Sequence, residues 1–143
     1  MKLSRTVAYA LQATVQLACS DSGHPVPCSR IASDGKMPER FLLQILRNLV
    51  AHGILASTRG VDGGYSLERS PESISLLEVI EAIEGPMVSG TPPSQGLPLR
   101  SRALLEQALA GVTGMARREL EAVTIAHLLP GPEDQVSELS RSR

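Results

Sequence analysis

Apolar residues in the first part of the chain recur at the three- and four-residue spacing of a helix. The first helix is expected to begin after Ser4, whose side chain can cap it, and to end near residues 21–23. The residues on its apolar face are Val7, Leu11, Val15 and Ala18. An extended connection should follow at residues 25–27, because each of the two prolines there disfavours helical geometry in the residue before it.

Two short helices joined by a tight turn are predicted next. The first runs from about Cys28 to Ala32 and is followed by the polar turn 34–36. Pro38 suits the first turn of the second helix, and Gly53 can supply the left-handed residue that ends it. This arrangement is typical of a helix-turn-helix.

The second of these helices has two distinct faces. An apolar stripe is expected to pack on the core, and it contains Phe41, Leu42, Ile45, Leu46 and Leu49. The opposite face is predicted to meet solvent with Arg40, Leu43, Gln44, Arg47 and Ala51.

A β-hairpin and a further helix complete the first half. Residues 54–58 and 65–69 read as two strands, and the glycine-rich loop 59–64 joins them. Ser75 and Glu78 have the spacing of a capping box, which opens a helix that continues to about Glu84. We therefore expect a winged helix-turn-helix domain over residues 1–85, mainly α-helical with a small β-hairpin as its wing.

The second half is organised differently. A proline-rich loop at 86–100 precedes a long helix and a short one within 101–129, and the tail 130–143 is polar enough to be disordered. The long helix carries an apolar stripe that we interpret as a homodimer interface, although an intramolecular core would give the same pattern. Its residues are Leu104, Leu105, Ala108, Leu109, Val112 and Met115.

Charge points to an acidic partner for the first half. The net charge is −1, but residues 1–70 hold eight Lys and Arg against five Asp and Glu, while the remainder holds six against ten. Only three aromatic residues are present, too few for a platform that stacks unpaired bases. The expected partner is therefore double-stranded DNA. No apolar run is long enough to span a membrane, and we expect a cytoplasmic protein.

The exposed face of the second helix has suitable chemistry for reading DNA. Arginine can donate two hydrogen bonds to guanine, glutamine can pair with adenine, and Leu43 can touch only a thymine methyl group. Glu39 complements the positive end of this helix. Arg59 would neutralise phosphates or enter the minor groove, and neighbouring glycines would let the loop approach closely. The candidate residues of the hairpin are Arg59, Gly60, Gly63, Gly64 and Tyr65.

Other chemistry has weaker support. The glycine-rich loop could suggest a phosphate cradle, but such a loop must open a helix, and here a strand follows. Cys28 lies near a helix start, yet no base accompanies it as a nucleophile would need, so we expect no enzyme. The two cysteines and three histidines lack the spacing of a metal site, and we predict neither metal nor cofactor.

Several segments resemble the Rrf2 family of bacterial regulators, typified by IscR, NsrR and CymR. They are Met1-Lys2-Leu3-Ser4, Tyr9-Ala10-Leu11, Ile31-Ala32, Arg59-Gly60, Gly63-Gly64-Tyr65 and Ile74-Ser75-Leu76. The resemblance covers residues 1–85 closely and the arm more loosely. It implies a homodimer whose long helices cross between subunits and whose winged domains read a near-palindromic operator. It also implies base contacts from Arg40, Leu43 and Gln44, a phosphate contact from Ser29, and Arg59 on the wing.

Two departures from the family pattern limit what the resemblance implies. Cluster-sensing members carry three cysteines in the loop before the dimerisation helix, whereas residues 86–103 here contain none. Leu43 stands where the iron-sulfur regulator has a charged residue, so operator sequence does not transfer. We expect the signal to be a small molecule or protein partner at residues 86–100. Oxidation of Cys28 is the alternative, provided that its helix-start position lowers its pKa.

The sequence therefore predicts a bacterial transcriptional regulator, in the first place a repressor. The alternative from another class is a winged-helix module that binds a protein and retains weak affinity for DNA.

Overall fold

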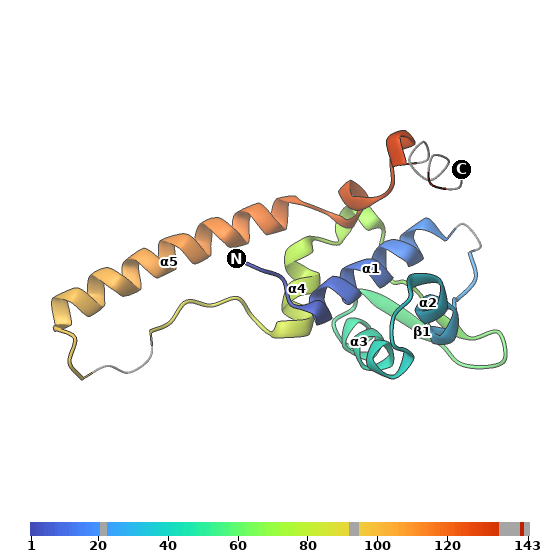
Figure 1. Cartoon of the computed structure of the whole chain (residues 1–143), viewed down its shortest axis with the longest axis horizontal. Coiled ribbons are helices and arrows are strands. Elements are labelled where there is room, and N and C mark those ends of the chain that lie inside the picture. The colour runs from blue at the N-terminus through green and yellow to red at the C-terminus, as the bar shows by residue number, and fades with distance from the viewer. Residues whose placement is uncertain (21–22, 92–94, 135–140, 142–143) are drawn as a thin grey trace.

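The computed structural model describes residues 1–20, 23–91, 95–134 and 141 of the chain. A winged domain at one end carries a long helical arm at the other (Figure 1). The predicted order of three helices, a hairpin, a helix and a long helix is confirmed. The elements are α1 (Arg5–Cys19), α2 (Cys28–Gly35), α3 (Glu39–Ala51), β1 (Leu55–Thr58), β2 (Gly64–Leu67), η1 (Pro71–Ser73), α4 (Leu76–Glu84), α5 (Leu99–Ala122) and η2 (Ile125–Leu128).

Capping residues stand at three of the helix starts, and the sequence predicts two of them, Ser4 and Ser75. The hydroxyl of Ser4 accepts a hydrogen bond from the backbone N–H of Val7 at 3.2 Å. Ser75 and Glu78 form both hydrogen bonds of a capping box at the start of α4. Thr124 stands at the N-cap of η2, and its backbone N–H donates a hydrogen bond to the Nδ1 of His127 in the first turn of that helix. Each cap satisfies a backbone donor that the helix itself leaves unpaired.

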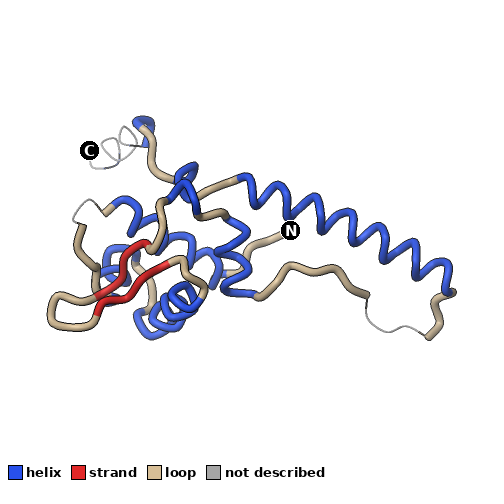
Figure 2. Tube along the Cα trace, turned by 180° about the vertical axis from the view of Figure 1, so that it is seen from behind, coloured by secondary structure: helices blue, strands red, loops and turns tan. Residues whose placement is uncertain are grey.

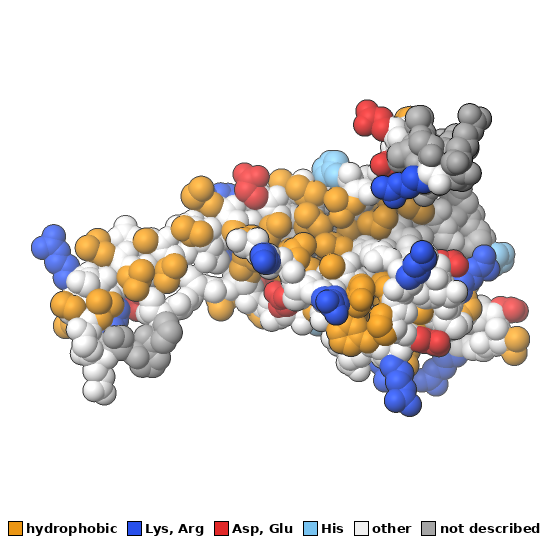
Figure 3. Space-filling model, in the orientation of Figure 1, with side chains coloured by type: hydrophobic (Ala, Val, Ile, Leu, Met, Phe, Trp, Pro, Cys, Tyr) orange, Lys and Arg blue, Asp and Glu red, His pale blue; other side chains and the backbone are white. Residues whose placement is uncertain are grey.

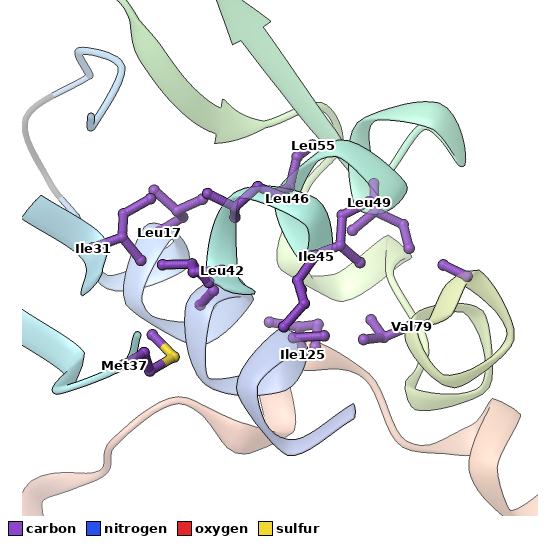
Figure 4. Close-up of a cluster of buried hydrophobic side chains, with 14 of the residues drawn as sticks. Leu17, Ile31, Met37, Leu42, Ile45, Leu46, Leu49, Leu55, Val79 and Ile125 are labelled. Atoms are coloured by element: carbon purple, nitrogen blue, oxygen red, sulfur yellow. The ribbon is translucent and has the colours of Figure 1, made fainter. Parts of the chain in front are cut away.

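The core lies where α3 crosses between α1, α2 and α4 (Figure 4). Four residues of the predicted stripe are fully buried: Leu42, Ile45, Leu46 and Leu49. The expectation for Phe41 is wrong, because its side chain is 42% exposed. The ring lies at the edge of the stripe, where it contacts Tyr9 edge to face with centroids 5.9 Å apart.

The turn between α2 and α3 lies two residues later than predicted. Helix α2 continues through Gly35, and the turn is made by Lys36, Met37 and Pro38. Lys36 adopts the left-handed conformation at φ 53°, and the N–H of Met37 donates to the carbonyl of Ala32 at 2.9 Å. These hydrogen bonds close the end of α2 and direct the buried side chain of Met37 into the core.

The wing is held by a segment distant in sequence. Strands β1 and β2 pair antiparallel, with Ser57 opposite Tyr65. Val26 of the extended segment 25–27 pairs with Tyr65 from the other side, exchanging hydrogen bonds of 2.8 and 2.9 Å. A Cβ on Gly64 would overlap the backbone of Val26 and Pro27. Glycine is therefore required at position 64 for this close approach.

The arm leaves the winged domain and returns to it. The connection after α4 runs outward and α5 runs back toward the domain, as both views show (Figures 1 and 2). At the root, Arg117 of α5 donates to Glu81 of α4 at 3.0 Å and to the carbonyl of Met87 at 3.1 Å. Beyond α5, the backbone N–H of Ile125 donates a hydrogen bond to the backbone carbonyl of Ile74, and the side chain of Ile125 is buried in the core.

None of the helices in the described part of the chain combines the length and apolar character that crossing a bilayer requires.

Candidate nucleic-acid interface

Helix α3 presents a polar face to solvent on the side opposite the core. Arg40, Gln44 and Arg47 are all exposed and lie on one side of the helix by their four- and three-residue spacing. Leu43 is half-buried between this face and the core. Among the described residues, the ion pairs are Arg30–Asp34, Arg69–Glu78 and Arg117–Glu81, so both arginines of α3 lie outside them. Their charges are available to an external anion.

Asn48 is a residue that sequence reasoning missed. The Nε2 of Gln44 donates to the Oδ1 of Asn48 at 3.4 Å, one helical turn further along α3. This contact restrains the amide of Gln44, a residue that is exposed to solvent. The four-residue spacing of the two amides, exposed Gln44 and half-buried Asn48, was the available signal.

The start of α2 lies close to the start of α3. Ser29 is exposed at the first turn of α2, and the thiol of Cys28 contacts the backbone carbonyl of Glu39 at 3.8 Å. Burial and the nearby Glu39 carboxylate raise the pKa of the Cys28 thiol above its ordinary value. A thiol pKa lowered by the helix start, the condition attached to oxidation of Cys28 as the alternative signal, is therefore not met, and the thiolate form that oxidation needs is disfavoured.

The hairpin tip projects beyond the domain. Arg59 and Gly60 are exposed, and the loop is closed by a hydrogen bond from the N–H of Gly63 to the carbonyl of Gly60 at 3.0 Å. Gly64 and Tyr65 are half-buried, and their backbones pack on or pair with the segment 25–27. These two residues position the wing, whereas Arg59 is free to meet a ligand.

The arm carries an apolar face that the described part of the chain does not cover. No residue of α5 is buried, and four side chains of the predicted stripe are largely exposed: Leu104 (58%), Leu105 (43%), Val112 (61%) and Met115 (61%). Ala108 is also exposed, and Leu109 is half-buried. Hydrophobic side chains follow the arm and continue onto the winged domain (Figure 3). These described residues therefore do not form an intramolecular core, which was the alternative interpretation of the stripe.

The domain contains three helices, and the third of them is the exposed second helix of a helix-turn-helix. A two-stranded wing follows. This arrangement defines a winged helix-turn-helix protein. Residues 3–131 match the family model Rrf2, described as an iron-dependent transcriptional regulator, and the chain belongs to this family. The resemblance that the sequence motifs indicated is thereby confirmed.

Individual relatives agree with this assignment. A Mycobacterium tuberculosis protein, provisionally named an HTH-type transcriptional regulator, is 39% identical over 89 residues, which are 62% of this chain and 55% of that protein. The matched stretch thus spans little more than half of that relative. Structures of CymR (YrzC), the global cysteine regulator of B. subtilis, and of T. potens IscR are both 26% identical and cover 90% of this chain. The matched regions make up 95% of the CymR chain and 85% of the IscR chain, and the TM-scores are 0.71 and 0.69.

The residues present do not fit the iron site that the family description implies. Protein iron-sulfur clusters are held chiefly by cysteine thiolates. The sequence has two cysteines, Cys19 at the end of α1 and Cys28 at the start of α2, and the connection before α5 has none. Within the described ranges, no three His, Cys, Asp or Glu side chains are grouped as metal ligands would be.

Proposed function

We propose that this protein is a homodimeric repressor that binds a near-palindromic operator in double-stranded DNA. The observation that carries the proposal is the exposed face of α3, where Arg40, Gln44 and Arg47 stand clear of the core. A helix with side chains is about 10–12 Å across and matches the roughly 12 Å width of the major groove. Arginine and glutamine are side chains that pair with guanine and adenine at two hydrogen bonds each.

The neighbouring residues would complete the contact with the duplex. Ser29 at the start of α2 would meet a phosphate, and Glu39 and Leu43 would lie near the bases beside Arg40. Arg59 at the exposed hairpin tip would neutralise phosphate or enter the minor groove. Gly60, where a Cβ would meet open space, leaves room for the sugar-phosphate backbone to approach the wing, whereas the Cβ position of Gly63 lies against the carbonyl oxygens of Thr58 and Gly60.

The arm supports the dimer. A 24-residue helix is about 36 Å long, and one exposing an apolar face along its length is unusual for a monomer. A second copy related by a two-fold axis would cover this face with the same residues. Such symmetry would also place two α3 helices on two half-sites about one helical turn of DNA apart, which is why a near-palindrome is expected.

Genomic fragment selection followed by footprinting tests the DNA side of the proposal. We expect one protected region with two inverted half-sites that overlaps a promoter, and in vitro transcription from that promoter should fall when the protein is added. Affinity should also drop steeply with salt, because several phosphates are contacted. Salt-independent binding, or no selection of fragments, would instead favour the alternative of a protein-binding module.

Sedimentation tests the dimer. Replacing Leu105 and Val112 with glutamate would bury uncompensated charge at the interface, which costs about 3–5 kcal/mol. We expect this double variant to be monomeric at micromolar concentration while keeping its helical circular dichroism. Ala110→Glu, on the opposite face of α5, is the matched control and should remain dimeric. A wild-type monomer would refute the homodimer.

We further propose that the regulator works without an iron-sulfur cluster, so that its signal is a small molecule or a protein. Anaerobic reconstitution with iron and sulfide, followed by visible absorption and metal analysis, tests this. Stoichiometric iron that is lost in a Cys19→Ala, Cys28→Ala double variant would overturn it.

A further inference from the structure

The side chain of Phe41 is an apolar surface at the start of α3. It belongs to the first turn of the helix and is 42% exposed. Its neighbours in sequence divide between two environments, because Leu42 is buried in the core and Arg40 is exposed with the polar face. A single exposed apolar residue is common on protein surfaces, so the position and orientation of this ring decide what it indicates.

Helix α1 holds the ring of Phe41 from one side. Tyr9, which is half-buried and packs on the core, meets Phe41 edge to face, with ring centroids 5.9 Å apart and an angle of 78° between the ring planes. Edge-to-face contact is a preferred geometry between aromatic rings. The ring of Phe41 is therefore restrained before any partner arrives, and less side-chain entropy is lost when its other side is covered.

The exposed side of Phe41 adjoins the polar face of α3. At about 100° per residue, Phe41 lies about 60° from Gln44 and about 20° from Asn48 around the helix axis. Gln44 donates to Asn48, so the ring and the two amides form one row along this flank of the helix. Leu43 lies on the opposite flank and is half-buried. Phe41 is thus the more exposed of the two apolar side chains beside the polar face.

The base edges of duplex DNA offer one apolar group to such a ring. In the major groove these edges present hydrogen-bond donors and acceptors, and thymine adds its C5-methyl group, which phenylalanine is able to contact. Along α3, three residues correspond to about 4.5 Å, close to the roughly 3.4 Å rise between base pairs. A helix that follows the groove and places Gln44 on an adenine would therefore bring Phe41 to a neighbouring base pair.

We propose that Phe41 is a specificity-determining residue that packs on the methyl group of a thymine in each half-site, next to the base pair that Gln44 reads. The contact rests on the proposed function, in which α3 enters the major groove. It assigns to Phe41 the apolar base contact that the sequence suggested for Leu43. Tyr9 is a positioning residue, because it holds the ring in place.

Uracil differs from thymine only by the missing methyl group, so replacing the thymines of the selected operator one at a time tests the contact directly. We expect one symmetry-related pair of thymines at which uracil weakens binding about fourfold per half-site, the value for one buried methyl group. Phe41→Ala should bind the thymine and uracil operators equally and should bind random DNA like the wild type. Phe41→Leu keeps an apolar side chain and should retain part of the preference.

Leu43→Ala is the matched control, since it shortens the other apolar side chain beside the polar face. It should keep the full preference for thymine. A preference that survived in Phe41→Ala but vanished in Leu43→Ala would assign the methyl group to Leu43 and overturn the proposal. Tyr9→Phe retains the ring contact and should keep the preference, whereas Tyr9→Leu should reduce it. An unchanged preference in Tyr9→Leu would remove the positioning role.

Nuclear magnetic resonance gives a second readout that needs no protein variant. Phe41 is the only phenylalanine of the sequence, so isotope labelling of this amino acid marks a single ring. In the complex with the operator, nuclear Overhauser effects should connect the ring protons to a thymine methyl group and disappear when that thymine is replaced with uracil. Effects to deoxyribose protons alone would place the ring on the sugar-phosphate backbone and contradict the thymine contact.

Further outcomes separate this contact from the proposed function. Operator binding that no uracil replacement weakens would refute the contact while leaving the proposed function intact. A Phe41→Ala variant that sediments as a monomer would place the ring in the dimer interface, which also refutes the contact. If the protein selected no DNA fragments, the proposed function itself would fail, and the thymine contact with it.

Discussion

Helices α3 and α5 each carry an apolar stripe, but one stripe is buried and the other is exposed. In α3, Leu42, Ile45, Leu46 and Leu49 are fully buried by the chain's own α1, α2 and α4. In α5, no residue is buried, although leucine, valine and methionine also recur along one face of the helix. An apolar stripe on a helix therefore indicates a surface that packs against other apolar residues. Whether those residues belong to the same chain or to another chain depends on how the rest of the chain is arranged around the helix.

The largest expected effect is on the free energy of unfolding, and it distinguishes the buried stripe of α3 from the exposed stripe of α5. Leu46→Ala should lower the free energy of unfolding by about 2–5 kcal/mol at every protein concentration, because it leaves a cavity inside one chain. Leu105→Ala should have an effect that grows with protein concentration, since it removes contact between chains. Denaturant unfolding at several concentrations measures both. A concentration-independent loss of similar size in Leu105→Ala would mean that α5 packs within its own chain.

A second prediction concerns the support of the wing. Gly64→Ala would force the wing away from the segment 25–27, and we expect about 1–3 kcal/mol of destabilisation together with weaker DNA binding. Gly96→Ala, where a Cβ meets open space, is the control for the same chemical change and should be close to neutral. Urea unfolding and operator titration provide the readouts. Equal behaviour of the two variants would remove the role assigned to the close approach at Gly64.

The same winged domain should contain two kinds of DNA contact. Arg59→Ala is expected to weaken binding to all sequences and reduce the dependence of log affinity on log salt by about one unit. Gln44→Ala should cost about 1–3 kcal/mol on the preferred operator and little on random DNA. Titrations of both DNAs at several salt concentrations distinguish the two. Wild-type binding by both variants would show that the reading surface lies elsewhere.

The smallest effect is expected at the junction between domain and arm. The hydrogen bond from Arg117 is the main cause that lowers the pKa of Glu81 below its ordinary value near 4.5. Its contribution to stability is present above that value and is lost as the pH falls through the lower folded-state pKa. Because the pair is partly exposed, we expect at most about 1 kcal/mol.

Unfolding of wild type and Glu81→Gln across the acid range tests this junction. The stability difference should be greatest above pH 5 and should disappear in stronger acid. A difference that stayed constant through the acid range would show that Glu81 acts by packing alone.

Local signals in the sequence predicted most of the fold. Ser4, Ser75 and Thr124 cap helices by contacts within three residues, which a linear pattern records directly. The error at Phe41 arose because this residue lies at the edge of the apolar stripe, where its side chain is 42% exposed beside the ring of Tyr9.

What the sequence did not predict depends on contacts between distant segments. The pairing of Val26 with Tyr65 joins segments 39 positions apart, and no periodicity encodes it. The glycine at position 64 was interpreted as freedom for the loop, whereas the structure shows it as space for the backbone of Val26 and Pro27.

The attachment of α5 at one end has a geometrical consequence. Its described contacts with the core are at the root, through Arg117 and the return of Ile125, while Leu99 lies eighteen residues away at the far tip. Such a length is about 27 Å, so a rotation of only about 5° at the root displaces the tip by roughly 2 Å. In the proposed dimer, the angle set at Glu81 and Arg117 would act through this lever arm on the distance between the two α3 helices. Operators whose half-site spacing differs by a base pair would then be distinguished by residues that never approach DNA.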